Sequence, residues 1–342
     1  MSDSKKFNVA VLGATGTVGE AMISILEERL FPVLKLYPLA SHRSAGETVL
    51  FKKKSHLVED VEQFDFSKVQ IALFSAGAEV SAIYAPKAVE AGCIVIDNTS
   101  YFRQVEGIPL VIPEVNAEDI AEFRNRGIIA NPNCSTLQML VALKPLHDAV
   151  GITRVNVATY QSVSGSGKPG IEELATQVSD LLNGRPIESV VYPKQVAFNV
   201  LPQCDEFLDN GYTREEMKLF WETQKIFKDP NIQVNATAVR VPVFYGHSMA
   251  IHLETARKIS AAEAKEILLE APGVIVIDEN QSGGYPTPIP EASGTDAVYV
   301  GRIREDISYP LGLNLWVVSD NIRKGAALNA VQIAEILVSD YL

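Results

Sequence analysis

The chain has few cysteines and no long apolar run, and each shortage excludes a class of protein. Only three cysteines occur in 342 residues, at Cys93, Cys134 and Cys204. They are too few and too scattered for a disulfide framework or for a zinc site with paired ligands. No stretch approaches the roughly 20 apolar residues that a membrane-spanning helix needs. We therefore expect reduced thiols, no bound metal and no membrane span.

Positive charge is also scarce. Lys and Arg number 30 against 42 Asp and Glu, which gives a formal net charge of −12. Binding to nucleic acid needs an excess of cations that displaces counterions from phosphates, so we expect no nucleic-acid partner. Any anionic ligand must instead be held by a few placed cations. The chain runs into a strand-like stretch at Phe7 without an apolar signal region, so we expect the protein to be cytoplasmic.

The length suits two domains, because single hydrophobic cores usually stop growing below this size. Within residues 1–130, apolar runs at 7–12, 34–40, 70–75 and 93–98 alternate with helical patterns at 20–30 and 80–91. This alternation is typical of a doubly wound, Rossmann-like parallel sheet. We therefore predict an α/β fold with a dinucleotide-binding N-terminal domain.

A different pattern covers residues 131–322. A predicted helix at 135–150 is followed by long alternating strands at 154–163, 249–257 and 313–318. Such strands suit a sheet with one covered face and one partly open face, which indicates an α+β domain. We predict that residues 323–342 form one amphipathic helix that packs back onto the first domain.

Three glycines at a spacing of three, Gly13, Gly16 and Gly19, follow the first strand and open a helical pattern. Glycines let the backbone approach a pyrophosphate, and the helix N-terminus stabilises its charge. The pattern favours a dinucleotide site. The alternative is a tight strand-to-helix turn without a ligand, since the more common spacing is G-x-G-x-x-G. The same turn contains Thr15, Thr17 and Val18.

The second predicted strand is followed by Ser41, Arg43 and Ser44. Enzymes that use NAD typically have an acidic residue here, which binds the ribose 2′-hydroxyl. A guanidinium with neighbouring hydroxyls instead suits a 2′-phosphate, because it forms charge-assisted hydrogen bonds that a carboxylate would oppose. The segment therefore indicates NADP rather than NAD, unless Arg43 is only a solvated surface residue.

Cys134 lies between an apolar strand and a helical pattern. A helix N-terminus stabilises a thiolate, which is the nucleophilic form of the side chain. A lone cysteine is as readily explained as buried filler, the interpretation that we adopt for Cys93 and Cys204. Position alone leaves both interpretations of Cys134 open.

A thiol nucleophile needs a proton acceptor, and the chain offers only five histidines. Four of them fall in the predicted cofactor turn, a charged segment, a helical pattern and a strand interior: His42, His56, His147 and His252. His247 remains, at the entrance to a strand and separated from Arg240 by an apolar stretch. We predict that His247 is the partner of the thiol.

In chain order, residues 13–19, 41–44, 133–136 and 240–243 resemble the aspartate-semialdehyde dehydrogenases of the bacterial type. The similarity runs from the glycine turn to the last predicted helix. It implies an NADP-dependent enzyme that reduces L-4-aspartyl phosphate to L-aspartate 4-semialdehyde, with release of inorganic phosphate, in lysine, methionine and threonine biosynthesis. It also implies a catalytic domain that forms the contacts of a homodimer or a homotetramer.

The resemblance assigns roles to single residues. Cys134 would form the acyl thioester, His247 would act as acid and base, and Gln161 would orient the intermediate. Arg240 would bind the substrate α-carboxylate, and Glu215 would bind its ammonium group.

Phosphate would lie between Arg103 and Lys218, with Asn98 beside them, because two converging cations suit a dianion. On a helix, a spacing of three would place Glu215 near Lys218, although composition alone favours a solvated ion pair. Three further positions match family residues near the nicotinamide: Ser164, Gly165 and Asn321.

Three other functions fit parts of the pattern. An N-acetyl-γ-glutamyl-phosphate reductase shares the two-domain plan and the cysteine, but its substrate has no free ammonium for Glu215. A glyceraldehyde-phosphate dehydrogenase has a different cysteine context and prefers NAD. A non-catalytic dinucleotide-binding regulator would bind NADPH without turnover.

Overall fold

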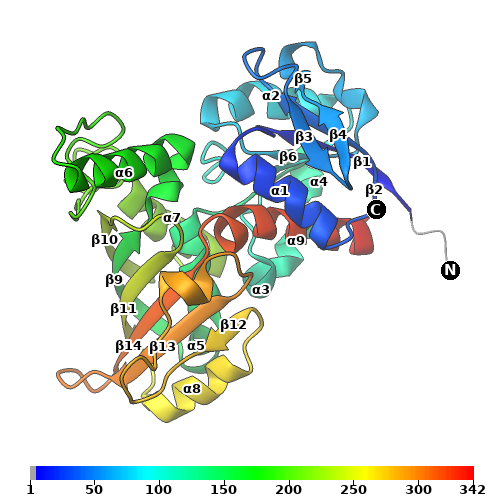
Figure 1. Ribbon diagram of the computed structural model, residues 1–342. Coiled ribbons are helices and arrows are strands. Elements are labelled where there is room, and N and C mark those ends of the chain that lie inside the picture. The colour runs from blue at the N-terminus through cyan, green and yellow to red at the C-terminus, as the bar shows by residue number, and fades with distance from the viewer. Residues whose placement is uncertain (1–4) are drawn as a thin grey trace. The chain divides into compact units, whose positions relative to one another are not determined.

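The computed structural model describes residues 5–342, and these form two compact units whose elements are labelled in Figure 1. Residues 1–4, at the start of the chain, lie outside the described part. The first unit contains the chain as far as Asn133 together with Ala326–Leu342, and the second unit is Cys134–Gly325. The chain therefore leaves the first unit once and returns to it at the C-terminal end.

The first unit is built on a six-stranded parallel sheet in the order β5-β2-β1-β6-β7-β8. Its strands are β1 (Phe7–Leu12), β2 (Val33–Ala40), β5 (Glu59–Asp60), β6 (Ile71–Phe74), β7 (Ile94–Asp97) and β8 (Ile128–Ala130). A separate hairpin pairs β3 (Thr48–Phe51) with β4 (Lys54–Leu57). The strand order runs outward from β1 in both directions. The predicted doubly wound sheet is confirmed, and ligands of such sheets bind beyond the carboxyl ends at this switch point.

Two helices from opposite ends of the chain share the core of this unit. Its helices are α1 (Thr17–Glu28), α2 (Ala78–Glu90), α3 (Pro113–Asn116), α4 (Phe123–Arg126) and α9 (Leu328–Asp340). Met22 and Ile25 of α1 and Ile333 and Leu337 of α9 join the sheet in one buried cluster, and Figure 1 shows the two helices side by side. The predicted return of the last helix to the first domain is confirmed.

The C-terminal helix differs from the prediction at its start. Residues 323–342 were expected to form one helix, but α9 begins only at Leu328, and Arg323–Ala327 form a wider π-helical turn. Asp320 explains this start, because its side chain accepts from the backbone N–H of Arg323 at 2.8 Å and its carbonyl accepts from Gly325 at 3.0 Å. The wider turn is therefore held from the residues that precede it.

The glycine turn between β1 and α1 requires glycine at two positions. Gly13 has φ +89°, in the left-handed region. A Cβ on Gly19 would lie 2.0 Å from the carbonyl oxygen of Gly13, so α1 starts in direct contact with the turn. The helix begins at Thr17 after Gly16, three residues before the predicted start at Glu20.

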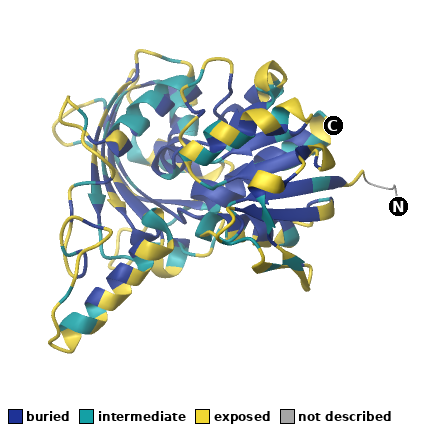
Figure 2. Ribbon diagram, turned by 90° about the horizontal axis from the view of Figure 1, so that it is seen from above, coloured by how far each residue is buried: buried dark blue, intermediate teal, exposed yellow. Residues whose placement is uncertain are grey.

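The second unit is built on a six-stranded mixed sheet in the order β10-β9-β11-β14-β13-β12. Its strands are β9 (Ile152–Gln161), β10 (Gln233–Arg240), β11 (His247–Thr255), β12 (Val274–Val276), β13 (Val298–Glu305) and β14 (Gly312–Ser319). Its helices are α5 (Cys134–Val150), α6 (Gly167–Leu182), α7 (Arg214–Phe227) and α8 (Ala261–Leu269). Buried residues alternate with more exposed ones along β9, as predicted for a sheet with one open face. Figure 2 shows that exposed residues gather on loops and outward helix faces.

Gly19→Ala should destabilise the first unit, because the new methyl group would lie 2.0 Å from the carbonyl oxygen of Gly13. The backbone must move, and overpacking of this kind costs about 1–3 kcal/mol. Gly16→Ala is the matched control, since its Cβ would meet the same oxygen at 3.3 Å. Thermal unfolding should show a lower midpoint for Gly19→Ala than for Gly16→Ala. Equal midpoints would contradict this account of the turn.

Candidate active site

In the second unit, two candidate active-site side chains bind the backbone of one residue, Ser162. Its N–H donates to His247 Nδ1 at 3.0 Å, and its carbonyl oxygen accepts from Arg240 Nη1 at 2.6 Å. Ser162 follows β9, Arg240 ends β10 and His247 begins β11. Because β9 lies between β10 and β11 in the sheet, strand pairing brings together side chains that are far apart in the sequence.

His247 is fully buried and uncharged. A backbone N–H can only donate, so the contact from Ser162 makes Nδ1 the acceptor and places the ring proton on Nε2. Burial, and then the positive charge of Arg240, lower the pKa of His247 to about 3. Nε2 has no hydrogen-bond partner among residues 5–342. At neutral pH the ring therefore offers one N–H to a ligand.

Arg240 is a buried cation with an unpaired hydrogen-bond donor. Its exposed fraction is 7%, and its Nε has no hydrogen-bond partner within the described part of the chain. The guanidinium carbon lies 5.8 Å from the centre of the Tyr192 ring. A planar guanidinium that is fixed through one nitrogen and unpaired at another is suited to a carboxylate, which it can bind through paired hydrogen bonds.

The three thiols differ as predicted. Cys93 and Cys204 are buried, and burial raises the pKa of both to about 12, so neither is a ready nucleophile. Cys134 is only half-buried and is the first residue of α5, where the helix N-terminus favours a thiolate. Cys204 interacts electrostatically with Arg240, Glu215 and Cys134. These groups therefore lie in one region of the second unit.

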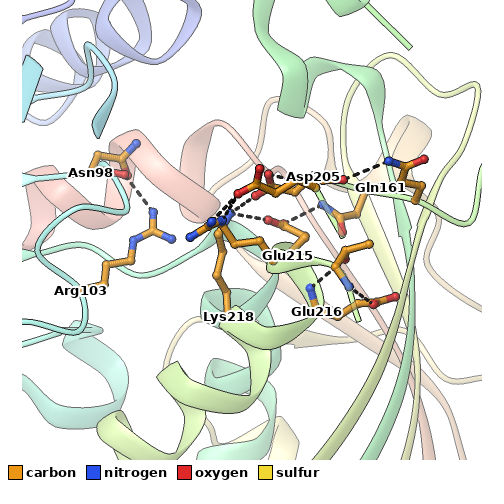
Figure 3. A network of polar contacts seen from close by, with 11 residues as sticks. Asn98, Arg103, Gln161, Asp205, Glu215, Glu216 and Lys218 are labelled. Atoms are coloured by element: carbon orange, nitrogen blue, oxygen red, sulfur yellow. Dashed lines mark hydrogen bonds and ion pairs between the residues drawn. The ribbon is translucent and has the colours of Figure 1, made fainter. Parts of the chain in front are cut away.

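A chain of polar contacts links α7 to the end of β9 (Figure 3). Lys218 Nζ lies 2.9 Å from both Glu215 Oε2 and Asp205 Oδ2, and Gln161 Nε2 donates to Glu215 Oε1 at 3.1 Å. Burial alone would lower the pKa of Lys218, but Glu215 and Asp205 together raise it above its usual value. The ammonium therefore stays charged. Glu215 and Lys218, three residues apart on α7, form a largely buried ion pair rather than a solvated one.

Asn321 forms hydrogen bonds with both the turn after β9 and the loop before β11. Its Oδ1 accepts from the backbone N–H of Gly246 at 2.9 Å, and its Nδ2 donates to Ser164 Oγ at 3.0 Å. A Cβ on Gly165 would lie 3.0 Å from Arg240 Nη1 and 3.4 Å from His247 Cε1. The three residues expected near the nicotinamide thus lie within the second unit, next to the histidine and arginine pair.

The residues predicted to bind the rest of the cofactor lie in the first unit. The glycine turn follows β1, and Ser41, Arg43 and Ser44 follow the neighbouring strand β2. Arg43 is exposed, and the backbone N–H of Ser44 donates to the carbonyl of Ser41 at 3.0 Å. Both segments lie beyond the carboxyl ends of paired parallel strands, the usual place for a dinucleotide.

The predicted phosphate-binding residues are divided between the units. In the first unit, Arg103 Nη2 donates to the backbone carbonyl of Asn98 at 3.0 Å (Figure 3). Arg103 is 8% exposed, so Asn98 fixes a largely buried guanidinium. Lys218 belongs to the second unit, where Asp205 and Glu215 hold it.

Two residues that sequence reasoning missed connect the predicted ones. Ser162 acts through its backbone, which has no signature in the sequence. Asp205 has φ +69°, an unusual conformation for a residue other than glycine, and its side chain contacts Lys218. No sequence motif singled out Asp205.

Residues 5–342 contain neither a metal-binding cluster nor a membrane-spanning helix. No group of three or more His, Cys, Asp or Glu side chains among them is arranged to hold a metal ion. Within the same residues, no helix combines the length and the apolar character that crossing a membrane requires.

Two family models match the chain. The model described as "Semialdehyde dehydrogenase, NAD binding domain" matches residues 8–123, and "Semialdehyde dehydrogenase, dimerisation domain" matches residues 143–324. The chain is 67% identical over 338 residues to the aspartate-semialdehyde dehydrogenase of Shewanella violacea, with 99% of each chain covered. It is 62% identical over 339 residues to that of Legionella pneumophila, with 99% and 98% covered.

Solved structures agree with these matches. Aspartate semialdehyde dehydrogenase II from Vibrio cholerae, complexed with ASA, has a TM-score of 0.97 and 60% identity, covering 99% of this chain and 100% of its own. The aspartate semialdehyde dehydrogenase from Candida albicans with NADP has a TM-score of 0.76 and 26% identity, covering 97% and 98%.

Gly165→Ala should reduce turnover without unfolding the protein. The added methyl would lie 3.0 Å from Arg240 Nη1 and 3.4 Å from the His247 ring, so the guanidinium must move. Small displacements of substrate-binding groups cost about ten- to a hundred-fold in kcat/KM. Steady-state kinetics and thermal unfolding should show this loss with a near-parental midpoint. Parental kcat/KM in the folded variant would mean that the space at Gly165 is not needed.

Proposed function

Because the chain belongs to the aspartate-semialdehyde dehydrogenase family, a family of nicotinamide-dependent oxidoreductases of amino-acid biosynthesis, we propose that it reduces L-4-aspartyl phosphate to L-aspartate 4-semialdehyde with NADPH and releases phosphate. The reaction would proceed through a thioester on Cys134 and would serve lysine, methionine and threonine biosynthesis in the cytoplasm. The observation that supports this assignment best is the shared contact of His247 and Arg240 with Ser162.

The charges of the second unit suit an amino-acid substrate. Arg240 is assigned to the α-carboxylate, because Nη1 fixes its buried guanidinium while Nε has no hydrogen-bond partner among the described residues. Glu215 is assigned to the ammonium group, and Gln161 and Lys218 fix the direction of its carboxylate. A substrate with a free α-amino group and α-carboxylate meets one opposite charge at each of these two groups.

Cys134 supplies the nucleophile. Its thiolate attacks the acyl carbon of aspartyl phosphate, the bond from that carbon to the phosphate oxygen breaks, and a thioester remains. The phosphate leaves toward Arg103 and Lys218, with Asn98 beside Arg103. The first residues of α5 place backbone N–H groups at the start of a helix, where they favour the negative charge that develops during attack.

His247 is assigned as the acid and base group, and in the reductive direction it acts through its Nε2–H. Its Nε2–H stabilises the oxyanion that forms when the thioester carbon is reduced, and the adduct then collapses to the aldehyde and the free thiolate. The nicotinamide supplies the hydride for this reduction when it is bound. Because Nδ1 is occupied by the Ser162 N–H, the ring keeps one orientation and one tautomer. Gln161, held by Glu215, is assigned to orient the acyl group.

The first unit fits a nicotinamide dinucleotide. A Cβ on Gly13 would lie 2.9 Å from Ser75 Oγ, and one on Gly19 would overlap the turn, so the glycines allow the close packing of strand, turn and helix that a pyrophosphate-binding turn needs. Thr15, Gly16, Thr17 and Val18 complete the pyrophosphate turn. Arg43 is assigned to the 2′-phosphate of NADP, with Ser41 and Ser44 beside it. Ser164, Gly165 and Asn321 are assigned to the nicotinamide end.

The matched dimerisation domain supports an oligomeric enzyme. We assign a homodimer, with a homotetramer as the larger alternative. The partly open face of the sheet in the second unit supports this assignment, since an incompletely covered sheet face is available for contact with another copy.

An assay with alternative substrates tests the proposed function. NADP reduction with phosphate is followed spectrophotometrically with aspartate semialdehyde, N-acetylglutamate semialdehyde and glyceraldehyde 3-phosphate. Aspartate semialdehyde should be favoured by about 1,000-fold or more, because N-acetylglutamate semialdehyde offers Glu215 no ammonium group and glyceraldehyde 3-phosphate offers Arg240 no carboxylate. Preference for N-acetylglutamate semialdehyde would instead establish the reductase alternative, and no turnover with any of them would support a binding protein.

Cys134→Ala should abolish turnover while the protein still binds NADP, because the substitution removes only the nucleophile. Cys93→Ala is the matched control, since it removes a buried thiol with a pKa of about 12. Turnover and NADPH fluorescence titrations should separate the two variants. Activity above the background rate in Cys134→Ala would refute the covalent route.

Arg43→Glu should weaken NADPH binding far more than NADH binding, by about ten-fold or more, since a carboxylate repels the 2′-phosphate. Lys87→Glu makes the same charge change at an exposed position on α2 and is the control. Fluorescence titration with both cofactors measures the effect. Equal losses for NADPH and NADH would remove the case for Arg43 as the 2′-phosphate ligand.

A further inference from the structure

Three asparagines of the first unit form a continuous chain of side-chain amides. Asn98 follows β7, Asn131 follows β8, and Asn329 lies in the first turn of α9. Asn329 Nδ2 donates to Asn131 Oδ1 at 2.6 Å, and Asn131 Nδ2 donates to Asn98 Oδ1 at 2.6 Å. Asn131 and Asn329 are 0% exposed. A buried polar chain of this kind is stable only when its donors and acceptors are matched throughout.

The direction of this chain is set at its buried end. Asn329 Nδ2 also donates to the backbone carbonyl of Val111 at 3.0 Å, and a carbonyl oxygen can only accept. Asn329 must therefore present its nitrogen here, so Asn131 must present oxygen to Asn329 and nitrogen to Asn98. Val111 is itself held, since its N–H donates to the carbonyl of Ala130 at 3.1 Å. Asn131 Nδ2 also donates to the carbonyl of Pro132 at 3.4 Å, so the Val111 carbonyl and, more weakly, the Pro132 carbonyl set the orientation of the three amides.

The amide chain ends at Asn98, a residue of the proposed phosphate site. Asn98 Oδ1 is occupied by Asn131, whereas Asn98 Nδ2 donates to no side chain or carbonyl among residues 5–342. The backbone carbonyl of Asn98 accepts from Arg103 Nη2. Asn98 therefore has a side-chain N–H donor available, and its backbone carbonyl holds the Arg103 guanidinium. A reversed amide would instead offer an oxygen, which repels an anion.

We propose that Asn131 and Asn329 are positioning residues that fix the amide of Asn98 with its N–H toward the phosphate group of the substrate. This proposal rests on the proposed function, because it takes Asn98 as a phosphate ligand. It assigns α9, the C-terminal helix, a part in phosphate recognition through a residue that does not touch the ligand. Leucine could fill the space at Asn329, so packing alone does not require three matched amides.

Asn329→Asp tests the proposal because an ionised carboxylate cannot donate, and a protonated carboxyl has a single hydrogen, which the Val111 carbonyl takes. Asn131 should then turn its nitrogen toward position 329 and give up its long bond to the Pro132 carbonyl. Asn98 should in turn direct its nitrogen toward Asn131, which leaves an oxygen facing the phosphate. In the phosphorylating direction, the KM for phosphate should rise about ten-fold or more. The KM values for aspartate semialdehyde and NADP should stay within about two-fold, because those sites keep their contacts.

A double-mutant cycle separates positioning from general damage. Asn98→Ala should itself raise the phosphate KM about ten-fold, and in that background Asn329→Asp should add almost nothing, because the amide that it reverses is gone. An undiminished effect of Asn329→Asp in the Asn98→Ala background would overturn the proposal. So would a parental phosphate KM in Asn329→Asp.

Asn116→Leu is the matched control. Asn116 is also a buried asparagine of the first unit, and it binds the Leu110 carbonyl and the Ile112 N–H on either side of Val111, outside the amide chain. It should lower thermal stability without changing the phosphate KM, and a comparable rise in KM there would overturn the proposal. Should Asn329→Asp not fold, Asn329→Ala replaces it, with an expected rise of about two- to three-fold that also vanishes with Asn98→Ala.

Failure of the proposed function gives different results. A parental enzyme that does not turn over aspartate semialdehyde would overturn the function itself. An unchanged phosphate KM in Asn98→Ala would overturn the assignment of Asn98 to phosphate, and the positioning role with it. A raised KM in Asn98→Ala with no effect of Asn329→Asp would overturn the positioning role alone.

Discussion

The backbone of Ser162 donates one hydrogen bond to a buried imidazole and accepts another from a buried guanidinium, and the proposed chemistry of the second unit depends on this pair of contacts. Burying a cation and a titratable ring is costly unless their polar atoms are bonded. A peptide group at the end of a paired strand can do this without side-chain freedom. The sheet order β10-β9-β11 then fixes Arg240 and His247 relative to each other.

Other polar groups of the second unit are also held by hydrogen bonds or ion pairs. Asn321 is bonded to the loop before β11, and Glu215 and Asp205 surround the Lys218 ammonium, so the polar groups of the site are oriented before substrate arrives. Preorganised dipoles and charges stabilise developing charge without reorganisation during the reaction. In the first unit, the amide chain from Asn329 to Asn98 would serve the same purpose for the phosphate group under our proposal.

Features with a local physical cause were visible in the sequence. The glycine turn, the cysteine before a helix and the alternation of strands and helices were correctly placed, because each depends on neighbouring residues. The β3–β4 hairpin was missed, since Lys52 and Lys53 form its turn at φ 49° and 61° without the Asn or Gly that such turns usually contain. Ser162 was hidden for another reason, because its backbone contacts join residues 78 and 85 positions apart.

The state of the His247 ring tests the central claim most directly. With Ser162 donating to Nδ1 and a pKa lowered from 6.5 to about 3, the ring should be neutral, with its proton on Nε2, at every pH well above that value. Nitrogen-15 NMR of histidine-labelled protein, with His247→Gln to assign the signal, can follow both ring nitrogens between about pH 5 and about pH 9. We predict one unchanging Nε2–H tautomer. A ring that becomes an imidazolium near its usual pKa, or that carries its proton on Nδ1, would contradict the account.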